Sequence, residues 1–525
     1  MNQSIIFQKV RFPVNEHTLE VSLSFGVEKT GIVGKNGTGK TSLLRLLMRE
    51  LEPVRGVVTI HTELAYLPQD YQFNLEHTVA QALGIRAIVE AIAQLKEDSQ
   101  NEGLLSVVGT NWDIEARALG LLQDFGFSGV TLSKKLKELS GGERMKVALV
   151  GLFILPERFI VMDEPTNNLD AQARHVLYQY IAGWKHGVLV VSHDRKLLEL
   201  VDQIAEVSPK GVSLYGGNYE YYETQKRAET EAAQRLFTTA QQEFKKIKKQ
   251  AQTVRERQEK RVSHAKKRVA TQNIPKILLG AMQRSGEETA GMLRTMHDER
   301  VTGARERLSA AKESIPPENQ IHVDLSNTEV AKGKRMVEVA GVSFDYADTQ
   351  NLISNISFGI YGQERVAIAG PNGSGKTTLI NLLLKKLPPK EGRILIGTER
   401  VAYLDQVVAI LNLEQTVLEN VVRISEISTD EARQWLSGFL FFGKDVFKKA
   451  NVLSGGERIR AGLAAILAGM HPAQLLVLDE PTNNLDLDSI QQLESALMNY
   501  RGNLLVISHD PAFLCAIGIE RYISL

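Results

Sequence analysis

Apolar residues recur along the chain in short unbroken runs, and two of these runs end in the same eight residues. Phe159–Met162 and Leu475–Leu478 each contain four consecutive apolar side chains. Both are followed by Asp-Glu-Pro-Thr-Asn-Asn-Leu-Asp, at Asp163–Asp170 and at Asp479–Asp486. An uninterrupted apolar run of this length is typical of a strand buried on both faces of a parallel sheet. The pattern predicts two central strands, each with two carboxylates at its carboxyl end, where ligands of open α/β sheets bind.

The same succession of motifs occurs in both halves of the chain. A glycine-rich loop, a glutamine, Leu-Ser-Gly-Gly-Glu, the octapeptide and Ser-His-Asp follow one another twice in that order. The spacing from loop lysine to glutamine agrees closely, from 40 to 69 and from 376 to 406. The spacing from glutamine to signature serine is longer in the first half, so we predict an insertion there, near 86–113. We expect a first domain at 1–222, a linker at 223–320 and a second domain at 321–525.

Each glycine-rich loop separates a strand pattern from a helix pattern. A single G-x-x-x-x-G-K-[ST] sequence also fits an ordinary tight turn, but its repetition in this context favours a phosphate-binding loop. Glycines let backbone N–H groups surround phosphates, and the helix N-terminus adds positive potential. The lysine is expected to reach the β- and γ-phosphates of ATP, and the threonine hydroxyl to bind Mg²⁺. The ATP-binding residues predicted here are Gly34, Asn36, Gly37, Gly39, Lys40, Thr41, Ser42, Gly370, Asn372, Gly373, Gly375, Lys376, Thr377 and Thr378.

Composition narrows the class of protein. A chain of 525 residues is long enough for two to four domains. Its 62 Lys and Arg balance 62 Asp and Glu, and Cys515 is its only cysteine, so an intrachain disulfide is excluded. The first residues lack the pattern of a signal peptide. The uncharged stretch Ala461–Leu478 contains His471-Pro472, which splits it into a helix, a turn and a strand. We expect no membrane segment and a cytoplasmic location.

The ordered motifs resemble an ATP-binding-cassette ATPase domain, twice in one chain. The likeness runs from Phe7 to Ser192 and from Val337 to Ser508. Two cassettes joined by a long charged segment resemble the ABC-F family, whose members act on ribosomes. The resemblance implies an α/β fold in which two P-loop NTPase cassettes are joined by a long α-helical hairpin. It also implies an ATPase that works as a monomer by pairing its own two cassettes.

The resemblance further implies a role for each motif residue. In paired cassettes, a nucleotide lies between the phosphate loop of one half and the Leu-Ser-Gly-Gly-Glu signature of the other. The aspartates of the octapeptides would then bind Mg²⁺, the glutamates would polarise water, and the histidines would hold it. The catalytic residues expected are Glu164, Glu480, His193 and His509. The expected Mg²⁺ ligands are Thr41, Gln69, Asp163, Thr377, Gln406 and Asp479. The signature residues expected at ATP are Ser140, Gly141, Gly142, Ser454, Gly455 and Gly456.

The chain departs from the family pattern at two places. Asn168 and Asn484 stand where family members commonly have histidine. An aromatic residue upstream of the phosphate loop commonly stacks on adenine, and Tyr346 matches that position in the second half. The first half has Val14 there, with Phe12 nearby. Tyr346 is therefore the candidate adenine platform of the second site, and the residue that would stack on adenine at the first site is left open.

The segment between the cassettes is basic and free of helix breakers over much of its length. It contains 21 Lys and Arg against 11 Asp and Glu from Lys226 to Glu313. Glycine and proline are absent from Lys226 to Asn273, which predicts one long helix. Pro275, Gly280 and Gly286 are expected to interrupt the pattern, and a returning helix from about Glu287 would complete an antiparallel hairpin.

The excess of positive charge in this segment indicates what kind of macromolecule it binds. Charge runs are commonly only solvated surface, but a single-signed excess in an otherwise acidic chain favours contact with structured RNA. No aromatic stacking set accompanies it, so backbone contacts are expected. The RNA-binding residues predicted are Lys245, Lys246, Lys248, Lys249, Arg255, Arg257, Lys260, Arg261, Lys266, Lys267, Arg268, Lys276 and Arg284.

Three classes of function fit these features. The first is a ribosome-associated factor that contacts rRNA and tRNA and either modulates translation or protects ribosomes against antibiotics. The second is the ATPase subunit of a membrane transporter, which the missing membrane segment and the basic linker disfavour. The third is a DNA-repair ATPase. Those with long coiled coils usually split one cassette across the coil, whereas each cassette here is complete.

Overall fold

The computed structural model describes residues 4–15, 17–96, 100–127, 129–156, 158–167, 169–271, 276–314, 320–321, 323–346 and 352–525. In the two long helices, the side chains of 258–259, 261–262, 265–271, 276–291 and 293–294 lie outside the description. The chain divides into two compact units. One unit comprises Met1–Glu220 and Asn319–Leu525 and holds both cassettes, and the other is Tyr221–Glu318.

The first cassette contains two sheets. One is antiparallel, in the order β2 (His17–Phe25), β1 (Ile5–Val14), β4 (Arg55–Ile60). The other has the order β5 (Leu64–Leu67), β6 (Phe159–Asp163), β7 (Val188–Val191), β3 (Lys29–Val33), β8 (Gln203–Ser208), β9 (Gly211–Gly216), and only β9 runs antiparallel to its neighbour. The predicted central strand is confirmed, because β6 pairs in parallel with β5 and β7 and is buried throughout.

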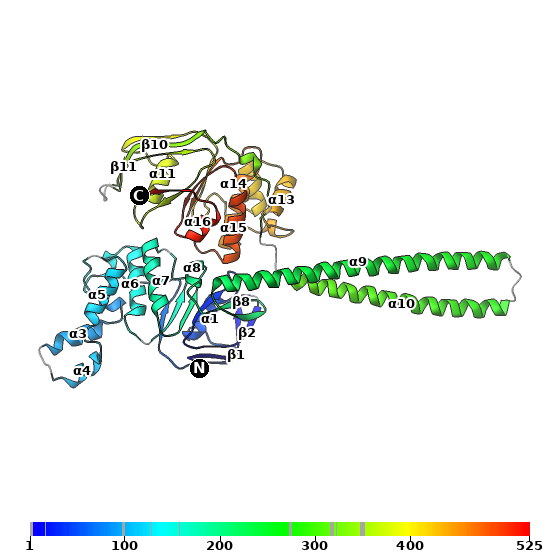
Figure 1. Cartoon of the computed structure of the whole chain (residues 1–525), viewed down its shortest axis with the longest axis horizontal. Coiled ribbons are helices and arrows are strands. Elements are labelled where there is room, and N and C mark those ends of the chain that lie inside the picture. Colours follow the sequence, from blue (N-terminus) through cyan, green and yellow to red (C-terminus); the bar gives the residue numbers. More distant parts are fainter. Residues whose placement is uncertain are drawn as a thin grey trace. The chain divides into compact units, whose positions relative to one another are not determined.

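The helix that follows the phosphate loop lies in the core between these sheets. Helix α1 (Lys40–Leu47) places Leu43, Leu44, Leu46 and Leu47 in one apolar cluster with strand residues such as Phe7 and Val161. The remaining helices of the cassette are α2 (Val79–Ala82), α3 (Arg86–Leu95), α4 (Glu102–Val108), α5 (Ile114–Asp124), α6 (Gly141–Phe153), α7 (Ala171–Gly183) and α8 (Arg195–Leu198), with a 3₁₀ turn η1 (Leu136–Glu138). In the predicted insertion, α3 and α4 lie next to each other (Figure 1). They share a small apolar cluster of their own.

The second cassette repeats this plan. Its antiparallel sheet has the order β11 (Ile353–Tyr361), β10 (Arg335–Phe344), β13 (Glu391–Ile396). Its parallel sheet has the order β14 (Val401–Leu404), β15 (Leu475–Asp479), β16 (Asn503–Ile507), β12 (Arg365–Ala369), β17 (Arg521–Ser524). Its helices are α11 (Lys376–Leu383), α12 (Val417–Ser425), α13 (Thr429–Gly438), α14 (Gly455–Leu467), α15 (Leu487–Asn499) and α16 (Pro511–Ala516), with 3₁₀ turns η2 (Ser326–Thr328), η3 (Asp445–Phe447) and η4 (Ala450–Val452). The uncharged stretch is indeed divided between α14 and β15.

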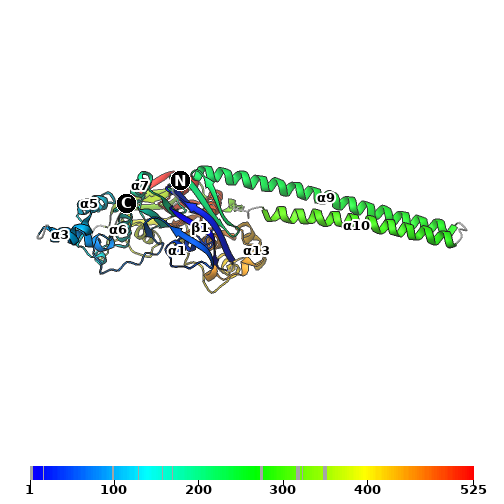
Figure 2. The ribbon, with the colours of Figure 1, turned by 90° about the horizontal axis from the view of Figure 1, so that it is seen from below.

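The second unit is an antiparallel helical hairpin, in which α9 (Tyr219–Thr271) and α10 (Lys276–Ser314) run side by side (Figures 1 and 2). An ion pair joins Arg307 to Glu243 at 3.3 Å, and Ala251 and Ala304 are buried along the hairpin. With 53 residues, α9 extends roughly 80 Å at about 1.5 Å per residue. No helix within these described ranges is long and apolar enough to cross a membrane.

Two predictions about the hairpin were wrong in their boundaries. Helix α9 begins at Tyr219, ahead of Lys226. Helix α10 begins at Lys276 and continues through Gly280 and Gly286, which were expected to interrupt it. A glycine within a helix costs only about 1 kcal/mol relative to alanine, which pairing with a neighbouring helix readily offsets. Local propensity was therefore overridden by the hairpin.

Candidate ATP sites

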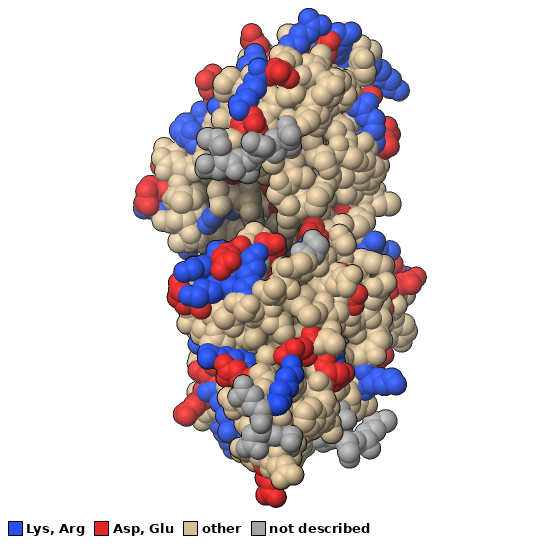
Figure 3. Space-filling view, turned by 90° about the vertical axis from the view of Figure 1, so that its left-hand side faces the viewer, with Lys and Arg blue, Asp and Glu red and all other residues tan. Residues whose placement is uncertain are grey.

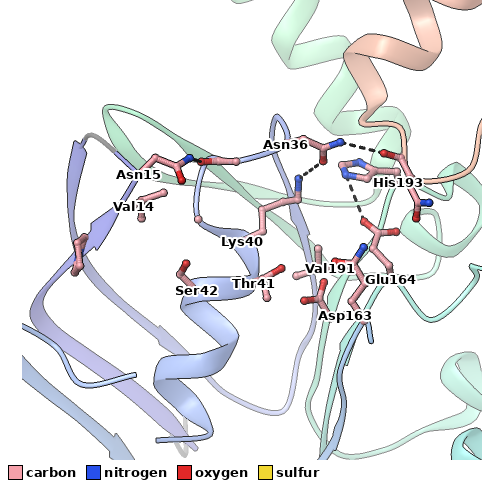
Figure 4. Close-up of a pocket in the computed structure, with 15 residues that line it drawn as sticks. Val14, Asn15, Asn36, Lys40, Thr41, Ser42, Asp163, Glu164, Val191 and His193 are labelled. Carbon is pink, nitrogen blue, oxygen red and sulfur yellow. Dashed lines mark hydrogen bonds and ion pairs between the residues drawn. The ribbon is translucent and has the colours of Figure 1, made fainter. Parts of the chain in front are cut away.

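The first site is a cavity of about 440 Å³ at the carboxyl ends of β3, β6 and β7 (Figure 4). Every predicted residue of the first phosphate loop except Gly34 lines it, together with Gln69, both octapeptide carboxylates and His193. Asn484 of the second cassette also lines it. The lining residues are Pro13, Val14, Asn15, Asn36, Gly37, Gly39, Lys40, Thr41, Ser42, Gln69, Asp163, Glu164, Val191, His193 and Asn484. The cavity thus assembles motifs that lie far apart in the sequence.

Both phosphate loops have the backbone geometry that their glycines predict. Gly39 and Gly375 precede α1 and α11 with φ of 101° and 91°, a left-handed conformation that glycine adopts without strain. A Cβ at Gly39 would also lie only 2.7 Å from Val14 Cγ2. Lys40 Nζ donates to Gly34 O at 2.6 Å, and Lys376 Nζ donates to Gly370 O at 2.8 Å. Each ammonium group is therefore held over its loop, where it can bind phosphate.

The octapeptide aspartates suit a divalent cation. Asp163 is buried, and both of its carboxylate oxygens lack a hydrogen-bond partner among the described residues. Burial raises the pKa of Asp163, and the nearby Thr41 hydroxyl and then the Lys40 ammonium oppose that rise. At the second site, Asp479 Oδ2 accepts hydrogen bonds from Thr377 Oγ1 at 3.2 Å and Tyr403 Oη at 3.3 Å. A carboxylate beside a threonine hydroxyl is the protein contribution that Mg²⁺ takes when phosphate oxygens and water supply its other ligands.

Each glutamate is paired with the histidine of its own cassette. His193 Nε2 lies 3.3 Å from Glu164 Oε1, and His509 Nε2 lies 3.4 Å from Glu480 Oε1. Both glutamates adopt positive φ, 50° and 46°, a strain that persists where surrounding structure enforces it. Burial raises the pKa of Glu164 to about 8 and that of Glu480 to about 7, the latter opposed mainly by Arg174 of the other cassette. Burial lowers the pKa of His193 to about 3 and that of His509 to about 4.

Burial determines the charge of each pair. Neutral histidines leave their ring nitrogens available for hydrogen bonding at physiological pH. A glutamate whose pKa lies near neutrality can take a proton from water and release it again, as a general base must. The two pairs therefore have the protonation chemistry expected for attack of water on a phosphoanhydride.

The end of the second octapeptide contacts the first phosphate loop. Asn36 N–H donates to Asp486 Oδ2 at 2.8 Å, and Asn36 Nδ2 donates to Asn484 O at 3.0 Å. Lys35 forms an ion pair with Asp488 at 3.2 Å. The roles of Asn484 and Asp486 were missed by sequence reasoning. One signal in the sequence could have indicated these roles. The octapeptide is repeated up to its last residue, beyond the Asp-Glu pair that the chemistry requires.

Each signature begins a helix. Glu143 N–H donates to Ser140 Oγ at 3.3 Å, and Ser140 N–H donates to Glu143 Oε2 at 2.7 Å, which completes a capping box. Ser454 and Glu457 form the same box at α14. A Cβ on Gly142 would lie 3.7 Å from Asn372 Nδ2, so the first signature lies beside the second phosphate loop.

For several residues predicted to bind ATP or Mg²⁺, the described structure shows no contact that tests the prediction. Ser454 and Gly456 are absent from the described lining of the first cavity, so their assignment to ATP stays a prediction. Gln406 is exposed at the end of β14. Asn168 lies outside the described residues.

The residues considered for contact with adenine lie in different surroundings at the two sites. Val14 lines the first cavity, whereas Phe12 is only 1% exposed in the core and cannot stack on a ligand. Tyr346 is 45% exposed and packs edge-on against Phe344, with ring centroids 5.1 Å apart. Its hydroxyl lies 3.4 Å from Thr378 Oγ1, which places the ring beside the second phosphate-loop helix.

Comparison with known proteins agrees with this geometry. The family described as ABC transporter matches residues 18–167 and 353–483, one range in each cassette. Energy-dependent translational throttle protein EttA of Escherichia coli (strain K12) is 31% identical over 538 residues, covering 96% of this chain and 89% of its own. ATP-binding protein Uup of Haemophilus influenzae is 30% identical, covering 94% and 74%. The solved structure of RNase-L Inhibitor has a TM-score of 0.58 at 20% identity, covering 99% of this chain and 87% of its own, a likeness of fold.

Two phosphate loops, two carboxylate–histidine pairs and relatives that span nearly the whole chain lead to one conclusion: the protein belongs to the ABC-F family of twin-cassette proteins and is an ATPase.

Proposed function

We propose that this ATPase binds the ribosome in its ATP-bound, closed state and modulates translation in the cytoplasm. A relative of nearly full length carries the name energy-dependent translational throttle protein, which supports an action in translation. The observation that carries the proposal is the exposed basic surface on helix α9 of the hairpin, because ribosomal RNA presents a dense array of phosphates.

Four lysines form the centre of that surface. Lys245, Lys246, Lys248 and Lys249 are exposed on α9, and none forms an ion pair with a described side chain. Arg255, by contrast, pairs with Asp298 of α10. Lysines without a carboxylate partner are free to neutralise phosphate, and the release of counterions from RNA then favours binding.

One face of the molecule offers a contrast to the hairpin. On the face drawn in Figure 3, Lys and Arg are interspersed with Asp and Glu on a largely uncharged surface. Arg257 and Lys260 extend the basic surface of the hairpin, since both are exposed. The side chains of Arg261, Lys266, Lys267, Arg268, Lys276 and Arg284 lie outside the description, so their contacts with rRNA or tRNA remain proposals.

ATP is proposed to act at the contact between the cassettes. Asn36 belongs to the first phosphate loop and already binds Asp486 and Asn484 of the second cassette. A ligand that orders this loop therefore acts on the cassette contact directly. We propose that Mg²⁺ binds at Asp163 and Asp479, that both sites hydrolyse ATP, and that hydrolysis releases the closed form.

Ribosome co-sedimentation tests this function. The Glu164→Gln, Glu480→Gln double variant should bind ATP without turning it over and should sediment with ribosomes when ATP and Mg²⁺ are present. The matched control is Lys40→Ala with Lys376→Ala, which cannot retain ATP and should stay in the supernatant. Recovery of the ATP-trapped protein on membranes or DNA, with none on ribosomes, would contradict the proposal. Translation and drug-sensitivity assays on the same variants distinguish modulation of translation from protection against antibiotics.

A further inference from the structure

Arg174 reaches from the first cassette into the loop that carries the histidine of the second. It projects from the first turn of α7 and its side chain is only 11% exposed. Its Nε donates to Leu169 O at 3.2 Å, just before the helix begins. Its Nη1 donates to the backbone carbonyl of His509 at 3.2 Å. The guanidinium is therefore anchored in one cassette and bonded to the other.

The same guanidinium also contacts the corresponding loop of its own cassette. Arg174 Nη1 lies 3.8 Å from Asp194 Oδ2, and Tyr178 Oη donates to that carboxylate as well. One side chain thus bridges the two Ser-His-Asp loops. On the second side, holding the His509 carbonyl fixes the backbone from which the ring reaches Glu480 at 3.4 Å.

The duplication shows that the equivalent position cannot form this bridge at the first site. The shared octapeptide aligns α7 with α15, so the residue equivalent to Arg174 is Ile490. Ile490 is only 2% exposed and belongs to the apolar core of the second cassette. An isoleucine side chain cannot donate to the carbonyl of His193. The two ATP sites therefore differ in a buried, charged contact and not only at their adenine platforms.

We propose that Arg174 is a positioning residue for ATP hydrolysis at the second site, supplied by the first cassette, and that the first site works without such a residue. The inference rests on the proposed roles of His509 and Glu480 in hydrolysis, and it is independent of ribosome binding. A buried hydrogen bond from a charged donor is worth more than a neutral one and orients its acceptor strongly. The contact between the cassettes then acts on the second ATP site through His509, and it acts on the first ATP site through Asn36.

Single-turnover ATP hydrolysis in two backgrounds tests the proposal. Glu164→Gln leaves hydrolysis to the second site, and Glu480→Gln leaves it to the first. Arg174→Ala should lower the rate about tenfold in the Glu164→Gln protein, with the KM for ATP within about twofold. In the Glu480→Gln protein the rate should change by less than about twofold. Arg174→Lys, which keeps the positive charge on a single donor nitrogen, should recover part of the loss.

Arg195→Ala is the matched control for weakening the cassette contact in general. Arg195 forms a two-point ion pair with Glu494 of the second cassette, at 2.8 and 3.1 Å, and has no hydrogen bond to His509 among the described contacts. Its loss should affect both backgrounds equally. Equal losses with Arg174→Ala, or no loss in either background, would overturn the positioning role.

Hydrogen exchange supplies a readout that does not depend on activity. With ATP bound, Arg174→Ala should speed exchange in the peptide spanning 508–510 more than in the peptide spanning 192–194, and an unchanged 508–510 peptide refutes the proposed contact. If the Glu164→Gln parent fails to hydrolyse ATP at all, the proposed activity of the second site is wrong, while the exchange result still decides the Arg174 contact.

Discussion

Glu164→Gln should stabilise the nucleotide-free protein at neutral pH while it stops catalysis at the first site. The side chain of Glu164 is 9% exposed, and burial raises its pKa to about 8 from an ordinary value of 4.5. At pH 7 the folded protein therefore keeps the carboxyl protonated, whereas the unfolded chain ionises it. Ionisation of the carboxyl at pH 7 lowers the free energy of the unfolded wild-type chain. Glutamine has nearly the same shape and never ionises, so the unfolded variant is not stabilised in this way.

The size of the effect follows from proton linkage. The folded state binds the proton more tightly, so wild-type stability falls as pH rises from 4.5 toward 8. About 2.5 pH units separate 4.5 from neutral pH, and each unit corresponds to about 1.36 kcal/mol, which gives roughly 3 kcal/mol at pH 7. The difference should shrink below about 1 kcal/mol at pH 5 and vanish near pH 4.

Urea unfolding without nucleotide or Mg²⁺ measures this difference. In a Trp435→Phe background, the remaining tryptophans, Trp112 and Trp184, both report on the first cassette. Glu52→Gln, at an exposed glutamate, is the control and should leave stability unchanged at both pH values. If Glu164→Gln adds no stability at pH 7, Glu164 is ionised in the folded protein and the electrostatic reasoning fails.

The other predictions concern pH, the trapped state and the hairpin. Hydrolysis should rise with pH in both the Glu480→Gln and the Glu164→Gln protein, because burial raises the pKa of the glutamate that remains and this carboxyl must ionise to accept a proton. A flat pH profile in both proteins would contradict the general-base role. In cells, the double glutamine variant should arrest growth by occupying ribosomes, whereas Lys40→Ala with Lys376→Ala should not, which growth curves check directly. Charge reversal should weaken ribosome binding at least tenfold and flatten its salt dependence when glutamate replaces Lys245, Lys246, Lys248 and Lys249. ATPase activity without ribosomes should be unchanged. Wild-type affinity for ribosomes would exclude contact of these lysines with ribosomal RNA. The side chains of 276–286 lie outside the description. Replacing this segment with a Gly/Ser turn should preserve ATP-dependent ribosome binding and abolish any effect on peptide synthesis or drug sensitivity. Wild-type behaviour in translation assays would show that the segment serves only as a structural turn.

The sequence by itself determined the features whose geometry is local. A phosphate loop needs glycine at the left-handed position before α1, and Gly39 could be identified from the motif alone. The capping box at Ser140 and the buried strand before Asp163 follow from spacing and apolar pattern in the same way. Because parallel strands bring their carboxyl ends to one edge, motif order also predicted that Lys40 and Glu164 would share a site.

Only the tertiary structure decided the contacts between distant segments and the electrostatics that depend on them. Asn36 and Asp486 are 450 positions apart, and nothing in either motif specifies that one donates to the other. Arg174 looks like an ordinary helical arginine until packing places His509 O beside it. The raised pKa of Glu164 is likewise a property of burial, because removing water penalises the charged carboxylate wherever the fold encloses it. The sequence specifies which chemical groups are present and how they are spaced. Packing determines which of these groups lose contact with water and which gain a partner.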